Sequence, residues 1–371
     1  GPAGPARPAP ATGAGGLLLL LLAYLAFVSI GLPDGLLGVG WPSIAADFGT
    51  PTEAVGLLLT GATVGYLTSS VLAGFSVARL GVGRLLAGST TLAAAALLGY
   101  AVAPGLGVMA ACGLALGLGS GAIDSGLNVY AASVFGPRHM NWMHACFGLG
   151  VALGPLTMTA VLSAGLAWRW GYGAVSGAEA LLAVAFTLTA RAWGRREAAR
   201  AGTVPHPRPS PDGRRPDATR VWDTLALPAV WFGALAFAVY VGIEIASGLW
   251  AFLLLTEGRG LPDAVAGVCV SIYWGSLFVG RIVQGIVAER IGATRVLRGS
   301  LAAMAVGAAL VAVPASGWLA VVGFAVIGFA AAPVFPLLTL TTAERVGRAH
   351  ADRAIGLQMG ASALGGALIP A

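Results

Sequence analysis

The sequence predicts an all-α membrane protein whose helices cross the bilayer many times. Of its 371 residues, 57% are hydrophobic and only 10% are charged, whereas a soluble domain has roughly 25% charged residues. This composition excludes a soluble globular domain and a disordered chain. The 56 glycines follow no three-residue period, which excludes a collagen-like chain. The recurrence of long apolar stretches and the placement of the arginines give the same prediction.

The apolar stretches number eleven, and each is long enough to cross a bilayer. About 20 residues of helix span the hydrocarbon core, and lipid leaves an isolated chain only the helix for pairing its backbone polar groups. We therefore expect helices at residues 17–45, 52–77, 84–103, 106–135, 142–166, 171–192, 225–255, 262–288, 294–313, 317–343 and 353–371.

Charge placement orients these helices. The chain has 21 arginines and no lysine. With a cytoplasmic N-terminus, all of them except Arg169 and Arg259 fall in cytoplasmic segments or at the cytoplasmic ends of helices. Short loops with this bias face the cytoplasm, so we expect a multi-pass cell-membrane protein with its N-terminus inside. The net charge of +6 therefore indicates membrane orientation and no nucleic-acid partner.

Four segments follow along the chain. Residues 1–16 are rich in Pro, Ala and Gly, and we expect them to be disordered. Residues 17–192 form a six-helix bundle, and residues 224–371 form a second bundle with five visible helices. The Arg- and Pro-rich stretch between them, 193–223, is predicted to be a cytoplasmic linker.

The two bundles contain related sequence motifs at matching positions. A frame G-x-x-x-x-R-x-G occurs twice, 211 positions apart, with the fixed residues Gly74, Arg79, Gly81 and Gly285, Arg290, Gly292. The embedded acids Asp34 and Glu244 lie 210 positions apart. This pattern indicates a duplicated six-helix unit, and many transporters are built from such repeats.

The duplicated loops and the six-plus-six layout resemble the major facilitator superfamily of transporters, over the whole chain from the first helix onward. The second loop matches the family's G-x-x-x-[DE]-R-x-G pattern with Glu289, whereas the first loop has Ala78 at the acidic position. Half of the family's usual charge relay is therefore lacking there. The resemblance implies twelve helices, so we expect the end of the eleventh and the whole twelfth to lie outside this sequence.

A narrower resemblance is to the fucose/proton symporter branch of that superfamily and its bacterial relatives. It is carried by residues 31–44, 121–136, 141–156, 240–250 and 271–281. In that branch, one acid in the first helix and one in the fourth handle substrate and proton, and Asp34 and Asp124 match these positions. Asn128 repeats the branch's acid-x-x-x-Asn spacing. The resemblance implies transport more strongly than it implies fucose as the solute.

The embedded acids Asp34, Asp124 and Glu244 favour the same function on physical grounds. A charged carboxylate at mid-bilayer costs roughly 2.5–3.5 kcal/mol on insertion scales, so each needs a cavity, a partner or a proton. The alternative is that each acid merely ties two helices together. An Asp and an Asn one helical turn apart can bind adjacent hydroxyl groups, so Asp124 and Asn128 suit a sugar or another polyol.

Local sequence adds detail around these acids. Pro33 lies next to Asp34 inside the first span, so we expect that helix to be broken or kinked there. Gly113, Gly117 and Gly121 form one helical face that continues to Asp124, which indicates close packing or a cavity. Tyr240 and Ser247 share a helix face with Glu244. The other candidate pocket residues are His144, Trp250, Tyr273, Trp274 and Gln358. A hydrogen bond to a loop explains His144 equally well, and packing is the better explanation for each aromatic taken singly.

These features predict a secondary active transporter that moves a small polar solute, such as a sugar, by proton symport with alternating access. The sequence has no nucleotide-binding, hydrolase or zinc-protease motif, so we expect neither an enzyme nor a metal or cofactor other than the coupling proton. We also expect a monomer. One alternative is a proton-coupled antiporter that exports drugs or metabolites, favoured by the partial antiporter motif at Gly150, Gly154 and Pro155. Another is a membrane receptor or scaffold.

Overall fold

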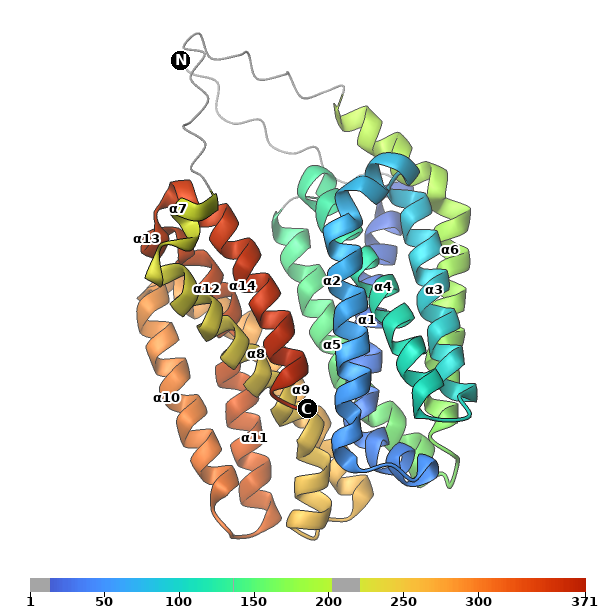
Figure 1. The fold of residues 1–371 in the computed structure, drawn as a ribbon, viewed down its shortest axis with the longest axis vertical. Helices are drawn as coiled ribbons and strands as arrows, with labels where there is room; N and C mark the ends of the chain where they lie inside the picture. The colour runs from blue at the N-terminus through green and yellow to red at the C-terminus, as the bar shows by residue number, and fades with distance from the viewer. Residues whose placement is uncertain (1–13, 136, 202–220) are drawn as a thin grey trace.

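The computed structural model describes residues 14–135, 137–201 and 221–371, and within these ranges every regular element is helical (Figure 1). The first half contains α1 (Ala14–Phe48), η1 (Thr52–Ala54), α2 (Val55–Leu80), α3 (Val82–Val102), α4 (Leu106–Tyr130), η2 (Ala131–Phe135), α5 (Pro137–Ser163) and α6 (Arg169–Ala201). The second half contains α7 (Val221–Leu225), α8 (Pro228–Leu253), η3 (Leu254–Gly258), α9 (Asp263–Ile291), α10 (Ala293–Ala312), α11 (Gly317–Ala331), α12 (Val334–Leu340), α13 (Thr342–Val346) and α14 (Arg348–Leu368).

In the described part of the chain, 10 helices are long and apolar enough to cross a membrane. They coincide with the first ten predicted spans. The eleventh predicted span forms α14, a helix of 21 residues whose first turns are polar. Large apolar side chains such as Val71, Leu188 and Phe232 are largely exposed on the helices. Exposed side chains of this kind are the ones that lipid solvates.

The two halves pair their helices in the same way. In the first half α1 packs on α5, α2 on α4 and α3 on α4; in the second, α8 packs on α14, α9 on α11 and α10 on α11. The predicted duplication is therefore visible in the packing. Within the described residues α3 also packs extensively on α6, and α10 has no equivalent neighbour.

Glycines place the same backbones in contact in both halves. Gly117 of α4 lies against the backbone of α2 at Ala62, and Gly328 of α11 lies against the backbone of α9 at Tyr273. Gly328 lies 211 positions after Gly117, and Tyr273 lies 211 positions after Ala62. A Cβ atom at either glycine would collide with a carbonyl oxygen, so only glycine permits this approach.

The duplicated loops end their helices in the same way. Gly81 follows α2 with φ of 73°, and Gly292 follows α9 with φ of 91°. This left-handed conformation carries a steric cost for other L-residues and suits glycine. Gly74 and Gly285 lie inside α2 and α9. The guanidinium of Arg79 lies 4.3 Å from the centre of the Phe75 ring, and the side chain of Glu289 lies outside the described residues.

Two predicted boundaries and one predicted helix break differ from the structure. The linker predicted at 193–223 begins inside α6, which continues to Ala201 because Ala, Arg and Glu favour helix. Its last residues belong to α7, and residues 202–220 lie outside the described residues, as do 1–13. The first helix is not broken at Pro33: α1 is helical from Ala14 to Phe48 with Pro33 and Pro42 inside it.

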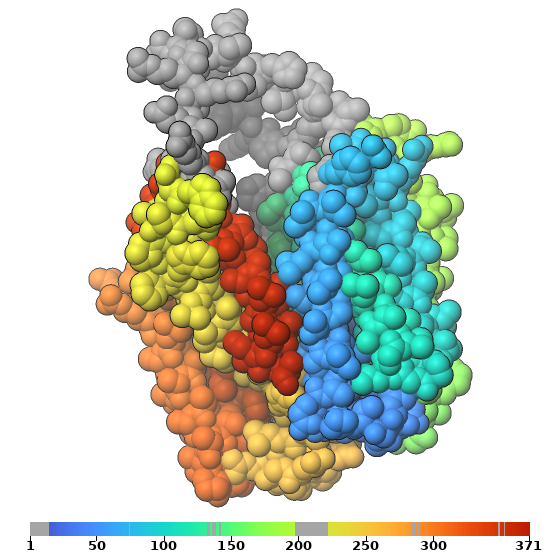
Figure 2. All heavy atoms as spheres, in the orientation of Figure 1, coloured from blue at the N-terminus to red at the C-terminus, as the bar shows by residue number. Residues whose placement is uncertain are grey.

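The halves meet along α5 with α9, α2 with α14, and α1 with α8. We call the end of the bundle where α6 ends and α7 begins the linker end. At the opposite end, Gly56 of α2 lies against Ala371. Figure 2 shows a furrow between α14 and α2 that is wider near the linker end. The two halves are therefore closed against each other at the opposite end and separated near the linker end.

Candidate functional site

Two polar clusters face each other across the contact between α5 and α9. The first lies in the N-terminal half and joins three helices. Tyr66 of α2 donates a hydrogen bond of 2.6 Å to Oδ2 of Asp124 on α4. Asn128 donates from Nδ2 to Oδ1 of Asp124 at 3.0 Å, and Nε2 of His144 on α5 lies 3.1 Å from Oδ1 of Asn128. The sequence paired Asp124 with Asn128, whereas it did not place His144 beside them and did not mark Tyr66.

The glycine face of α4 explains this arrangement. Gly117 and Gly121 bring α4 into contact with α2 at Ala62 and Tyr66. The next residue along the same face is Asp124, which therefore meets the Tyr66 hydroxyl. Asp124 and Asn128 are partly exposed and His144 is exposed, so the side chains of this cluster are not fully enclosed by protein.

The second cluster surrounds Glu244 in the C-terminal half. The Tyr240 hydroxyl is hydrogen-bonded to Oε2 of Glu244 and lies 2.8 Å from the carbonyl oxygen of Ala331. Tyr273 donates to the backbone carbonyl of Glu244 at 2.8 Å. Nη2 of Arg281 on α9 lies 3.8 Å from Oε1 of Glu244, so the carboxyl group faces a hydroxyl on one side and a cation on the other.

The register of α5 on α9 places the two clusters level with each other. These helices run antiparallel, with Gly267 against Thr159 and Gly148 against Phe278. Roughly one turn further toward the linker end come His144 on α5 and Arg281 on α9, which are close enough for their charges to interact. The polar residues of the two halves therefore meet where the halves themselves meet.

Asp34 lies apart from both clusters. It lines a cavity of about 40 Å³ within the N-terminal half, together with Leu58 and Leu59 of α2, Tyr100 of α3 and Tyr172 of α6. A space of this size can hold a water molecule. Tyr66 is close enough to both Asp34 and Asp124 to interact electrostatically with each. Asp34 is itself exposed, so this space is open at the acid and is not sealed inside the half.

Some predicted pocket residues have packing partners instead. Nε1 of Trp250 donates to the carbonyl oxygen of Pro370 at 2.9 Å. Trp274 is buried against Gly248, and Gln358 is buried and accepts a hydrogen bond of 2.9 Å from Thr342. Gly154 packs α5 on α1 at Gly35, so close helix packing accounts for the glycine of the partial antiporter motif.

Sequence reasoning missed two charged residues inside the membrane spans. Arg281 was assigned to the cytoplasmic positive charges, although it lies within the apolar stretch of α9 at 263–283. Glu179 of α6 is buried, and its Oε2 atom has no hydrogen-bond partner among the described residues. An ionisable residue inside an apolar stretch is the signal that marks both of them. Across the described residues no three His, Cys, Asp or Glu side chains gather as metal ligands would.

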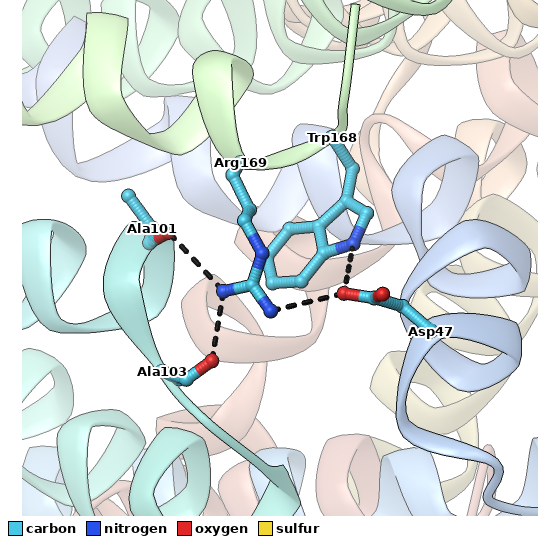
Figure 3. Close-up of polar contacts among 5 residues, drawn as sticks. All are labelled: Asp47, Ala101, Ala103, Trp168 and Arg169. Atoms are coloured by element: carbon cyan, nitrogen blue, oxygen red, sulfur yellow. Dashed lines mark hydrogen bonds and ion pairs between the residues drawn. The ribbon is translucent and has the colours of Figure 1, made fainter.

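Arg169 and Arg259, the two arginines outside the predicted cytoplasmic segments, have structural roles at the end of the bundle opposite the linker end. Nη1 of Arg169 donates to the carbonyl oxygens of Ala101 and Ala103 at the end of α3, at 3.2 and 2.7 Å, and Nη2 donates to Asp47 at 2.9 Å (Figure 3). Trp168 donates to the same carboxylate at 3.2 Å. In the second half, Arg259 donates to the carbonyl oxygen of Val311 in the last turn of α10 at 2.6 Å. Each arginine thus caps the carbonyl end of a helix, where positive charge is favourable.

Sequence comparisons give two relatives and one family. The family model described as Major Facilitator Superfamily matches residues 19–370. An uncharacterized MFS-type transporter of Yersinia pestis is 26% identical over 305 residues, which cover 80% of this chain and 73% of that protein. Sodium-dependent glucose transporter 1 of Homo sapiens is 23% identical over 295 residues, covering 67% of this chain and 52% of that protein. The chain thus spans about half the length of this second relative.

Solved transporters share the fold. A D-xylose-proton symporter matches with a TM-score of 0.74 at 14% identity, over 95% of this chain and 88% of its own. A mutant of the nucleoside transporter NupG matches with a TM-score of 0.73 at 16% identity, over 95% of this chain and 89% of its own. At these identities the likeness establishes the helix arrangement and nothing about the solute.

Proposed function

The chain belongs to the major facilitator superfamily of membrane transporters, and from this premise we propose that it moves a small hydroxylated solute, such as a sugar, by proton-coupled symport. It works by alternating access as a monomer in the cell membrane, with the linker end in the cytoplasm. The furrow at that end corresponds to an inward-open state.

The hydrogen-bond inventory around Glu244 supports proton coupling. The Tyr240 hydroxyl has one proton but lies beside two acceptors, the Glu244 carboxyl group and the Ala331 carbonyl oxygen. If Glu244 carries a proton, it donates to Tyr240 and Tyr240 donates to Ala331, so every group is satisfied. If Glu244 is ionised, Tyr240 donates to it and Arg281 supplies the opposite charge. The same site therefore accommodates both protonation states, as a proton carrier must.

The cluster across the interface supports a hydroxylated solute. The Asp124 carboxylate, the Asn128 amide and the His144 ring lie in one hydrogen-bonded row whose side chains are partly or largely exposed. Carboxylates and amides bind the vicinal hydroxyls of a sugar as acceptors and donors. One structural neighbour is a D-xylose-proton symporter and one relative is a sodium-dependent glucose transporter, whereas other neighbours carry nucleosides or peptides.

The test uses the purified chain in lipid vesicles that contain a pH-sensitive dye. A panel of pentoses and hexoses is added outside, and proton entry and labelled sugar uptake are recorded together. We expect one or more sugars to drive proton entry. Glu244→Gln should abolish proton entry while sugar exchange across the vesicle membrane continues, because the amide mimics only the protonated acid.

The control is Glu257→Gln, which changes an exposed acid in η3 and should behave as the unmodified protein. Proton coupling that survives Glu244→Gln would falsify the assignment of Glu244. Absence of transport for every sugar, with proton-driven efflux of a dye or drug, would identify the antiporter instead.

A further inference from the structure

Arg281 is a charged side chain inside a membrane span, and most of its hydrogen-bonding capacity is unused. It belongs to the apolar stretch of α9 at 263–283, and its side chain is 23% exposed. The nearest carboxylate oxygen, Oε1 of Glu244, is 3.8 Å away, which is too long for a hydrogen bond. Among the described residues its guanidinium makes no hydrogen bond, although guanidinium has five N–H donors.

The neighbouring acids already have donors of their own. Asp124 accepts from Tyr66 and Asn128, and Glu244 is hydrogen-bonded to Tyr240. Since Asn128 donates its Nδ2 to Asp124, its Oδ1 faces His144, and Nε2 of His144 carries the hydrogen between them. Among the described residues, the largest unused capacity at the interface is therefore the set of donors on Arg281, and the second N–H of the Asn128 amide and the other ring nitrogen of His144 are also unused.

Unused donors on a cation call for a ligand that brings acceptors and negative charge. From this inventory we propose that Arg281 binds a carboxylate of the transported solute, while Asn128 and His144 contact its hydroxyl groups. The solute class is then a hydroxylated carboxylate, that is, a sugar acid. The planar guanidinium matches a carboxylate with two parallel hydrogen bonds, and leaving a guanidinium without a partner inside the membrane is costly. This inference rests on the proposed proton symport and refines its solute.

Charge balance connects the carboxylate to the proton. In the empty site Glu244 supplies the negative charge opposite Arg281. When the solute carboxylate takes this place, the ionised Glu244 would lie beside a second anion, and it becomes neutral by taking a proton from the external medium. One anion and one proton then cross together and are both released inside, so no net charge moves. The transport of a sugar acid should therefore be insensitive to membrane potential.

The test compares a sugar acid with the corresponding neutral sugar in lipid vesicles. Labelled D-glucuronate, D-glucose and D-glucose 6-phosphate are the probes, and uptake is measured under an inward proton gradient with the membrane potential set to zero or to an inside-negative value. We expect glucuronate uptake to exceed uptake of the other two and to be independent of potential. A preference for the sugar phosphate would keep the anion subsite but assign it to phosphate.

Three variants locate the effect. Arg281→Gln should raise KM for glucuronate at least about tenfold, because a hydrogen bond to a charged group is lost, and it should change glucose uptake much less. Arg281→Lys should raise KM for glucuronate by an intermediate factor, since lysine keeps the positive charge but cannot donate two parallel hydrogen bonds to a carboxylate. Arg298→Gln changes an exposed arginine of α10 and should leave both solutes unaffected. Elution of each variant as a single peak in detergent confirms folding.

Equal loss of glucuronate and glucose uptake in Arg281→Gln would mean that Arg281 only supports the structure. Proton-coupled transport of glucose without glucuronate transport would overturn the sugar-acid inference and leave the proposed symport intact. Absence of coupled uptake for all three probes would overturn both.

Discussion

The two halves of the molecule share their packing and differ in their charges. Gly117 on Ala62 in the first half is repeated as Gly328 on Tyr273 in the second, at the common offset of 211 positions. At the same offset, Asp124 corresponds to Phe335, and Arg281 corresponds to Ser70. The first half thus has an acid that the second lacks, and the second has a cation that the first lacks. The repeat preserved the glycine contacts that hold the helices together and changed the charged residues near the contact between the halves.

The duplicated acids show the same divergence. Asp34 and Glu244 hold nearly equivalent positions in α1 and α8, 210 residues apart. Asp34 borders a small cavity inside its own half, whereas Glu244 is bound by Tyr240 and lies near Arg281. Position in the repeat therefore does not fix the environment of an acid, because the neighbouring helices contribute different side chains.

The largest effect on stability is expected at the two glycines that make equivalent helix contacts in the two halves. Gly117→Leu and Gly328→Leu should each destabilise the protein by about 3 kcal/mol or more, because the new side chain collides with the backbone of the partner helix. Gly88→Ala in α3 is the control, since no atom lies within 4 Å of the place that the new Cβ would take. Thermal unfolding in detergent checks this. If only one of the two leucine variants unfolds, the packing equivalence of the halves is wrong.

The next largest effect is expected at Asp124, and it distinguishes the role of this acid from that of Glu244. Asp124→Asn should weaken solute binding about tenfold or more, because the amide replaces a charged acceptor that Tyr66 and Asn128 both use. Equilibrium exchange of labelled solute measures this loss without a proton gradient. Glu53→Gln, an exposed acid at the opposite end, serves as the control. Unchanged exchange in Asp124→Asn would remove the first cluster from the solute site.

A smaller effect is expected at the tyrosine that connects Glu244 to α11. Tyr240→Phe removes the hydroxyl between Glu244 and Ala331, so proton-coupled uptake should fall about fivefold, the effect of losing roughly 1 kcal/mol. Solute exchange without a proton gradient should change little. A loss of both activities by the same factor would indicate a packing role for Tyr240.

The smallest effect is expected at the opposite end, where Arg169 and Arg259 cap equivalent helices. Arg169→Ala should lower stability by about 1 kcal/mol, because partial exposure weakens its ion pair with Asp47. Arg259→Ala should have a smaller effect, since Arg259 makes one hydrogen bond where Arg169 makes three. Thermal unfolding ranks the two variants, and the reverse order would show that the single bond at Val311 dominates.

Sequence reasoning predicted the helices well and the site in part. Apolar stretches of membrane length located the spanning helices and α14 closely. The exceptions are that α6 runs into the predicted linker, α7 lies at the end of that linker, and the span predicted at 317–343 is divided into α11, α12 and α13. Helix spacing correctly joined Tyr240 to Glu244 and Asn128 to Asp124, since residues four apart share a face. It did not reveal the partners that lie on other helices, such as Tyr66 for Asp124 and Arg281 for Glu244.

The sequence by itself determined the membrane-spanning helices and the duplication, because both depend on hydrophobicity and spacing along one chain, and its loop motifs already resembled the family whose model matches the chain. Only the tertiary structure decided that Asp34 borders a small cavity in its own half, while Asp124 is hydrogen-bonded to Tyr66 and Glu244 lies near Arg281 of α9. The physical reason is that every embedded polar group must find a partner, and in a bundle of helices that partner is supplied by whichever helix packs beside it.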